Sequence, residues 1–112
     1  MSCLFCSIAE GTIPSQKAYE DDLCLVFHDI SPQAPVHLLV IPKEHIESVA
    51  AVTAENAPLV AHMMTVIAKL AEELGLDSGF RVVSNCGKDA QQSVPHLHFH
   101  LLAGRELGWP PG

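Results

Sequence analysis

The sequence predicts an α+β domain in which an antiparallel β-sheet packs against one long helix. Two features favour this class: one long amphipathic helical pattern, and short strand patterns on both sides of it. Of the 112 residues, 48% are hydrophobic and 17% are charged, which suits a single core and excludes a disordered chain. We therefore expect residues 1–112 to form one domain.

The long helix is expected where apolar residues recur at intervals of three and four, between residues 59 and 74. Asn56 is expected to cap its start, Pro58 suits the first turn, and Gly75 lies where the helix should end. A second, short helix of one or two turns is expected over residues 5–10.

Five segments have the pattern of strands, and the first two should form a hairpin. They are residues 18–20, 23–28, 37–41, 80–84 and 95–103. Residues 37–41 are almost continuously apolar, which is typical of a buried central strand. With one long helix on one face of the sheet, the other face would need short helices or a partner subunit to cover it.

The charge balance argues against some classes of partner. The formal net charge is −7, so electrostatic binding to long nucleic acid or to an anionic membrane is not expected. Local donors could still hold one phosphate. The N-terminus lacks the features of a signal peptide, and no stretch approaches the roughly 20 apolar residues of a membrane span. We expect a cytoplasmic protein with reduced thiols.

Three histidines alternate with apolar residues in the segment His96-Leu97-His98-Phe99-His100. On a strand these imidazoles share one face at intervals of about 6.6 Å. Such a row suits metal ligation, or nucleophilic and acid–base chemistry. The preceding loop, residues 85–94, is rich in hydrogen-bond donors and could cradle a phosphate. This loop favours attack at phosphorus.

The run QSVPHLHFHLL at residues 92–102 resembles the histidine-triad motif, His-x-His-x-His followed by apolar residues. Further matches span most of the chain: FCSI at 5–8, YEDD at 19–22, HDISPQAPVH at 28–37, VIPK at 40–43 and WPPG at 109–112. The sequence is therefore similar to the HINT branch of the histidine triad (HIT) family, the histidine triad nucleotide-binding proteins.

This resemblance implies the HIT-like fold, with a five-stranded, mostly antiparallel sheet that continues across a homodimer. It implies hydrolysis of purine nucleoside 5′-phosphoramidates of the adenosine 5′-monophosphoramidate type. His98 would attack the α-phosphorus and form a nucleotidyl-histidine intermediate, which water then hydrolyses. The chemistry would require no metal ion.

The resemblance also implies a role for each matching position. The implied catalytic residues are His98, His96, His100, His37 and Ser93. The implied nucleotide contacts include Asp29 at the ribose, with His28 beside it. The base pocket would be lined by Phe5, Ile8, Phe27, Ile30 and Leu39. The phosphate would be contacted by Asn85, Gln92, Ser93, Val94, His98 and His100.

Cys3 and Cys6 have the spacing of zinc ligands, but such a pair needs two more ligands. Several microbial HIT proteins are similar here: they bind structural zinc through this pair, a histidine after Ile-Pro-Lys and the first triad histidine. The resemblance thus implies Zn²⁺ bound by Cys3, Cys6, His45 and His96, with a structural role. The alternative is two unligated thiols.

Three other functions remain open. The triad histidines could be the ligands of a zinc hydrolase, or the protein could be a non-catalytic, nucleotide-binding regulatory dimer. The third is a dinucleoside polyphosphate hydrolase.

The chain departs from many close relatives at Ala90-Gln91, where they have two glycines, and at Pro95. Trp109 matches tails that, in the family, can reach the active site of the partner subunit.

Overall fold

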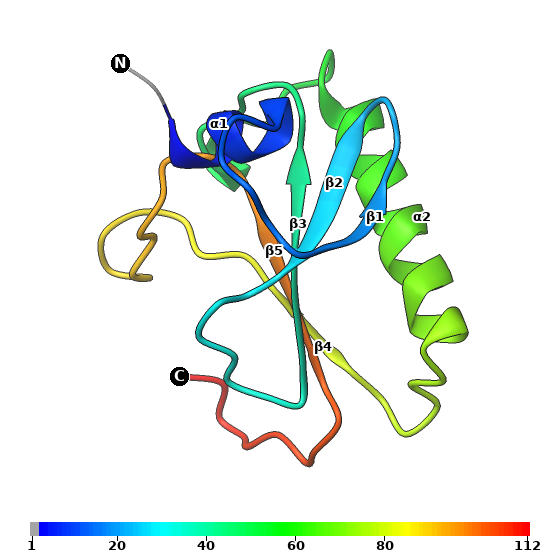
Figure 1. Cartoon of the computed structure of the whole chain (residues 1–112). Coiled ribbons are helices and arrows are strands. Elements are labelled where there is room, and N and C mark those ends of the chain that lie inside the picture. Colours follow the sequence, from blue (N-terminus) through cyan, green and yellow to red (C-terminus); the bar gives the residue numbers. More distant parts are fainter. Residues whose placement is uncertain (1–2) are drawn as a thin grey trace.

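Five antiparallel strands form one sheet, in the order β1-β2-β3-β5-β4 (Figure 1). The computed structural model describes residues 3–112. Its helices are α1 (Leu4–Glu10), the 3-10 helix η1 (Val49–Ala51) and α2 (Ala57–Glu73). Its strands are β1 (Lys17–Glu20), β2 (Cys24–His28), β3 (Val36–Pro42), β4 (Arg81–Val83) and β5 (Phe99–Ala103). The predicted α+β class and the five strands are confirmed.

Alternation along β2 and β3 divides the core between the two faces of the sheet. Helix α2 packs on one face, over a cluster made of Cys24, Val26, Leu38, Val40, Met63, Val66, Ile67, Leu70 and Leu101. Helix α1 packs on the opposite face, over Phe5, Ile8, Leu25, Phe27, Leu39 and Ile41 (Figure 1). A short helix thus covers part of the second face. Within residues 3–112, neither α-helix is long and apolar enough to cross a membrane.

The long helix begins at Ala57 and ends at Glu73, close to the predicted bounds. Pro58 lies in its first turn, as expected, and Gly75 follows its end with φ +69°, a conformation that suits glycine. Asn56 occupies the N-cap position of α2, as predicted, but its side chain makes no capping hydrogen bond. Its side-chain oxygen instead accepts the N–H of Thr53 at 2.7 Å, so this side chain stabilises the preceding turn.

The turn between β1 and β2 is organised by Asp21, whose carboxylate accepts the N–H groups of Leu23 and Cys24. It also accepts the hydroxyl of Tyr19 and lies 2.7 Å from Nε2 of His62 on α2. Burial alone would raise the pKa of Asp21, but these hydrogen bonds, led by that of His62, hold it well below its ordinary value. The turn is thereby tied to the long helix, a link that the sequence did not indicate.

Strand β5 begins at Phe99, four residues later than the sequence predicts. Its neighbour β3 ends at Pro42, which has no N–H to continue the ladder. The carbonyl of Pro42 instead faces the ring of His96 at 2.9 Å. His96 and His98 therefore precede the strand, and only His100 of the three lies within it. The other predicted strand ends differ from the observed ones by at most one residue.

Candidate active site and metal centre

The ring of His98 is held in one orientation and in one tautomer. Its Nδ1 lies 2.7 Å from the carbonyl oxygen of His96, which can only accept, so Nδ1 carries the proton. In the neutral ring, Nε2 then keeps its lone pair. The ring is 4% exposed and packs edge-on against Phe5, with ring centroids 5.0 Å apart. Ser84 donates to the His98 carbonyl at 2.9 Å and fixes the backbone. A fixed neutral imidazole with a free lone pair has the chemistry of a nucleophile.

His100 on β5 and His37 on β3 lie on the same face of the sheet as diagonal neighbours, since His100 pairs with Leu39. Nδ1 of His37 accepts the N–H of Gln33 at 3.0 Å, so Nε2 of His37 carries the proton. That Nε2 lies 2.9 Å from Nδ1 of His100 and 3.4 Å from a carboxylate oxygen of Asp29. His100 therefore accepts at Nδ1 and presents an N–H at Nε2.

Burial lowers the pKa of both His37 and His100 from the ordinary histidine value. Asp29 opposes this effect at each ring, and neighbouring histidines add to it at His100. Both rings are consequently neutral near pH 7. A neutral pair is required for this chain of hydrogen bonds, because a protonated His100 would turn a second N–H toward the N–H of His37.

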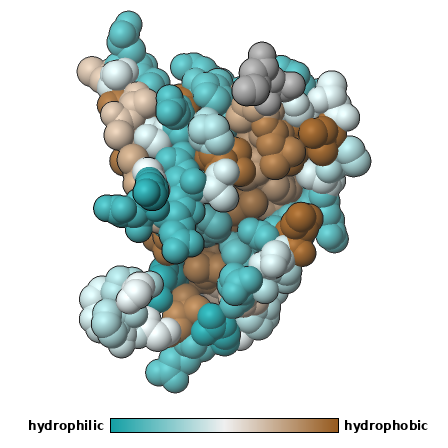
Figure 2. Space-filling view, turned by 90° about the vertical axis from the view of Figure 1, so that its left-hand side faces the viewer, coloured by the Kyte–Doolittle hydropathy of each residue, from teal (hydrophilic) through white to brown (hydrophobic). Residues whose placement is uncertain are grey.

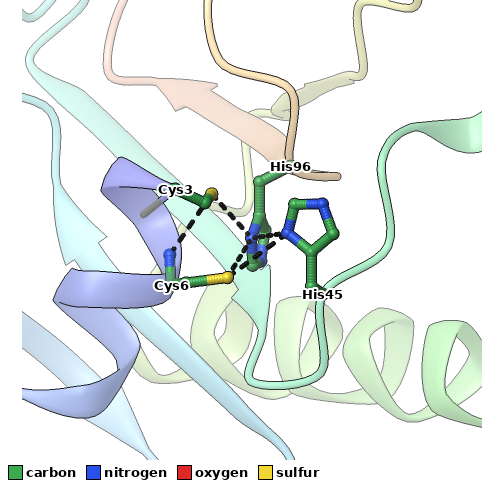
Figure 3. Close-up of side chains that lie close together, drawn as sticks. All are labelled: Cys3, Cys6, His45 and His96. Carbon is green, nitrogen blue, oxygen red and sulfur yellow. Dashed lines mark hydrogen bonds between the residues drawn. The ribbon is translucent and has the colours of Figure 1, made fainter. Parts of the chain in front are cut away.

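Four potential metal ligands meet where the start of α1, the loop after β3 and the segment before β5 come together (Figure 3). Their donor atoms all lie within 4.8 Å of one another, and they belong to Cys3, Cys6, His45 and His96. Nδ1 of His96 lies 3.4 Å and 3.5 Å from the two sulfurs and 3.2 Å from Nδ1 of His45. A tetrahedral zinc ion holds sulfur and nitrogen ligands about 3.5 Å apart, so the spacing fits.

The protonation states in this cluster also suit a cation. Nε2 of His96 donates to the carbonyl of Pro42 at 2.9 Å, which leaves the lone pair of Nδ1 facing the sulfurs. Burial lowers the pKa of His96 and so favours the neutral ring that a metal needs. Burial and the nearby Cys3 raise the pKa of Cys6, so a cation is needed to hold its thiolate. The cluster could therefore bind a metal ion such as zinc.

The three triad histidines do not share one metal position within residues 3–112. Nδ1 of His96 faces two sulfurs, Nδ1 of His98 faces a carbonyl, and Nδ1 of His100 faces another histidine. This arrangement argues against a zinc hydrolase that uses all three as ligands.

Most side chains expected at the base pocket pack together on the α1 face of the sheet. These are Phe5, Ile8, Phe27 and Leu39. Each is between 5% and 8% exposed, and Val94 packs against the same cluster. Ile30 is 101% exposed and lies outside the cluster, because it follows β2 in the loop before β3. Ile30 therefore does not pack with the other four in this chain, and its contact with a base stays a prediction.

The side chain of Gln92 forms hydrogen bonds with backbone groups within and beside the predicted phosphate loop. Its side-chain N–H groups donate to the carbonyls of Glu47 and Val94, and its side-chain oxygen accepts the N–H of Gly87. The polar atoms of this amide are thus already paired with the backbone. The other expected polar contacts are half-buried or exposed, and their binding of nucleotide stays a prediction: Asn85, Ser93, His28 and Asp29.

An open hollow of about 500 Å³ lies between the metal cluster and the phosphate loop. It is lined by Cys3, Leu4, His45, Glu47, Ser93, Val94 and Pro95. Figure 2 shows the face of the molecule that lies on the left of Figure 1, where hydrophobic surface runs between hydrophilic margins. A ligand bound on this face would meet both kinds of surface.

The chain has relatives along almost its whole length. Residues 2–107 match the family model described as scavenger mRNA decapping enzyme C-term binding. An HIT-like protein of Synechococcus elongatus is 49% identical over 109 residues, which cover 97% of this chain and 96% of that protein. The chain belongs to the histidine triad (HIT) family.

Solved structures of HIT proteins have the same fold. A HIT family hydrolase from Legionella pneumophila is 46% identical, with a TM-score of 0.97 over 99% of this chain and 100% of that one. A histidine triad nucleotide-binding protein from Candida albicans is 35% identical, with a TM-score of 0.83 over 99% of this chain and 85% of that one. The expected HIT-like fold is thereby confirmed.

Three contributors to the site were missed by sequence reasoning: the N–H of Gln33, the hydroxyl of Ser84 and the carbonyl of Pro42. Two of them are backbone groups, and the residue type does not reveal what a backbone group binds. Ser84 binds a backbone carbonyl across two strands, and no spacing motif marks such a contact.

Proposed function

We propose that this HIT protein hydrolyses purine nucleoside 5′-phosphoramidates, with His98 as the nucleophile, as in the HINT branch. The observation that carries the proposal is the 2.7 Å hydrogen bond from Nδ1 of His98 to the carbonyl of His96, which leaves the Nε2 lone pair free. The presence of hydrolases and of a nucleotide-binding protein among the solved relatives supports the same class of reaction.

In the first step, Nε2 of His98 forms a bond to the α-phosphorus and the P–N bond of the substrate breaks. The departing amine needs a proton. Ser93 is exposed and could relay this proton from solvent. The Nε2–H of His100 would stabilise the negative charge that develops on the phosphoryl oxygens. In the second step, water attacks phosphorus, the bond to His98 breaks, and the nucleoside monophosphate is released with net consumption of one water.

The nucleotide would lie on the α1 face of the sheet. Asp29 is half-buried, and one carboxylate oxygen already accepts the N–H of Ser31 at 2.7 Å. The other oxygen can still accept from a ribose hydroxyl, and such a charge-assisted bond would favour ribose. Phe5 and Phe27, whose rings meet edge to face at 5.6 Å, would contribute apolar surface for the purine.

We further propose that the protein is a homodimer in which β4 continues the sheet into a second copy. Within residues 3–112, β4 pairs with β5 alone and forms one edge of the sheet. Phe80 and Val82 leave 44% and 38% of their surfaces exposed at this edge. Light scattering during size-exclusion chromatography tests the proposal, and a monomeric mass at micromolar concentration would reject it.

A trapping experiment tests the proposed chemistry. Wild type, His98→Ala and the control His62→Ala, which changes a histidine on α2, are each mixed with adenosine 5′-monophosphoramidate. Each reaction is quenched rapidly, and the intact protein is weighed by mass spectrometry. We expect an added nucleoside monophosphate on wild type and on His62→Ala, and none on His98→Ala. Equal release of the amine by wild type and by His98→Ala would eliminate the mechanism.

A further inference from the structure

Arg105, in the segment that follows β5, holds the loop between β2 and β3. Its Nε and Nη2 atoms both donate to the carbonyl of Gln33, at 3.2 Å and 2.9 Å. A third donor, Nη1, binds the carbonyl of Glu106 at 3.1 Å and thereby fixes the guanidinium to its own backbone. In Figure 1 the C-terminal segment (red) runs beside the loop that leads into β3 (cyan). The fork of Arg105 is thus a tether between two segments that are distant in sequence.

A second, independent observation, at Gly104, shows that these two segments lie close together. This residue has φ +96°, and a Cβ added to it would lie 2.8 Å from Cβ of Pro35. Only glycine fits such a contact without displacing the loop. The segment after β5 is therefore seated directly against the loop that carries Gln33.

Gln33 is bound on both sides of its α-carbon. Its carbonyl accepts from Arg105, and its N–H donates to Nδ1 of His37 at 3.0 Å. The same loop begins at Asp29, which stands 3.4 Å from Nε2 of His37. The N–H of Gln33 and the carboxylate of Asp29 thus both favour a proton on Nε2 of His37, and any drift of Gln33 would weaken the shorter of these two contacts.

The tautomer of His37 also sets the tautomer of His100, the ring that would face the substrate phosphate. With Nδ1 of His37 accepting from Gln33, its Nε2–H points at Nδ1 of His100, 2.9 Å away. His100 then bears its own proton on Nε2. If His37 adopted the other tautomer, its Nε2 would become an acceptor, and His100 would turn its proton inward and lose the outward N–H.

We propose that Arg105 is a positioning residue: by binding the carbonyl of Gln33, it keeps His37 and His100 in the tautomers that present an N–H to the substrate phosphate. This inference rests on the proposed function for its catalytic consequence. The tautomers themselves are a property of the protein alone.

The test compares Arg105→Gln with Arg105→Lys and with the control Arg81→Gln. Arg81 is the matched control because it also binds the C-terminal segment, through the carbonyl of Gly108 at 2.8 Å, and within residues 3–112 its side chain makes no hydrogen bond to the loop. Long-range nitrogen–proton NMR correlations identify the tautomers of His37 and His100 in the full chain without substrate. Amide exchange at Gln33 and steady-state kinetics complete the measurement.

In Arg105→Gln we expect mixed tautomers at both rings, and amide exchange at Gln33 faster by about tenfold. We expect kcat to fall by about tenfold with KM within about twofold, because the lost donor acts mainly in the transition state. Arg105→Lys should recover part of the effect, and Arg81→Gln should match wild type in tautomer.

Unchanged tautomers and unchanged exchange at Gln33 in Arg105→Gln would overturn the inference. So would equal changes in Arg81→Gln, since these would reflect a general loosening of the C-terminal segment. If wild type fails to trap a nucleotide, the proposed function fails while the tautomer measurement still decides the role of Arg105.

Discussion

The two ends of the segment from His96 to His100 use the same side chain in opposite ways. At the first end, His96 donates through Nε2 to the carbonyl of Pro42 and directs a lone pair at two sulfurs. At the other end, His100 accepts at Nδ1 from His37 and directs an N–H away from the sheet. Between them, His98 donates through Nδ1 and keeps a lone pair at Nε2. Regular spacing thus gives two tautomers in three environments: His96 and His100 carry the proton on Nε2 and His98 carries it on Nδ1, because each ring meets a different partner.

Under the proposed function, the comparison separates a structural end at His96 from a reactive end at His100. A metal at the first end would join α1 to the segment before β5 without taking part in bond breaking. The backbone carbonyl of His96 nevertheless orients His98, so the two ends are mechanically connected.

The largest difference is expected within the triad itself. His98→Ala removes the nucleophile, and we expect kcat/KM to fall by about 10⁴-fold or more. His100→Ala removes one hydrogen-bond donor to the developing charge, so we expect a fall of about 10²–10³-fold. Steady-state kinetics on an adenosine phosphoramidate measures both, with thermal unfolding as the control for folding. Equal losses in the two variants would contradict the assignment of different states.

At the sulfur end, Cys6→Ser should cost stability and not primarily chemistry. If the site holds zinc at about 1,000 times its Kd, losing the ion removes about 4 kcal/mol of stability. For a domain of this size we expect Tm to fall by about 15 °C or more. Calorimetry and metal analysis by mass spectrometry measure the effect.

Cys86→Ser serves as the matched control, because Cys86 is an exposed thiol outside the cluster. It should keep the metal content and the Tm of wild type. If Cys6→Ser and Cys86→Ser behave alike, or if wild type purifies without metal and gains no stability from added zinc, the cluster is only a pair of reduced thiols beside two histidines.

The reactive end should make the protein sensitive to mild acid. Burial holds the pKa of His37 and His100 in the folded chain below the unfolded value of about 6.5. The unfolded chain therefore binds more protons as the pH falls below about 6.5. The stability from these neutral rings is complete above that pH and is lost as the pH falls through the folded pKa values.

Thermal unfolding of the metal-loaded protein between pH 8 and pH 5 measures this loss. The double variant His37→Gln, His100→Gln should show a weaker dependence on pH than wild type. His28→Gln, which changes an exposed histidine, should keep the dependence of wild type. If the double variant kept the full pH dependence of stability seen in wild type, that dependence would arise from other groups in the chain.

The sequence was sufficient for the fold because its information lies in side-chain patterns. Short apolar segments bounded by turn residues predicted the strands, and a spacing of three and four predicted α2. The pattern could not show where β5 begins, because that depends on a missing N–H at Pro42 in the neighbouring strand. Nor could it show that the side chain of Asn56, at the N-cap position of α2, makes no capping hydrogen bond because its oxygen accepts the N–H of Thr53.

For the site, residue type and family resemblance indicated which histidines and cysteines come together. The tautomers were beyond prediction, because they are set by the backbone groups of Pro42, His96 and Gln33. The exposure of Ile30 was also missed, since an apolar side chain in a matched motif is ordinarily assigned to a pocket. The tautomers depend on contacts between segments that are distant in the chain. The exposure of Ile30 depends on the course of the loop that follows β2.

The smallest expected effect concerns the point between the two ends. Ser84 donates to the carbonyl of His98 at 2.9 Å, and Ser84→Ala removes that bond while leaving the tautomer of the ring intact. Because the carbonyl loses one partner in a half-buried position, we expect a loss of about 1 kcal/mol in the free energy of unfolding. The rate should fall only a few-fold, since the nucleophile keeps its lone pair. Ser78→Ala, at an exposed serine in the loop after α2, provides the control in urea unfolding. If Ser84→Ala lowered the rate as much as His100→Ala does, the backbone of His98 and not its ring partner would govern reactivity, and the contrast between the two ends would lose its meaning.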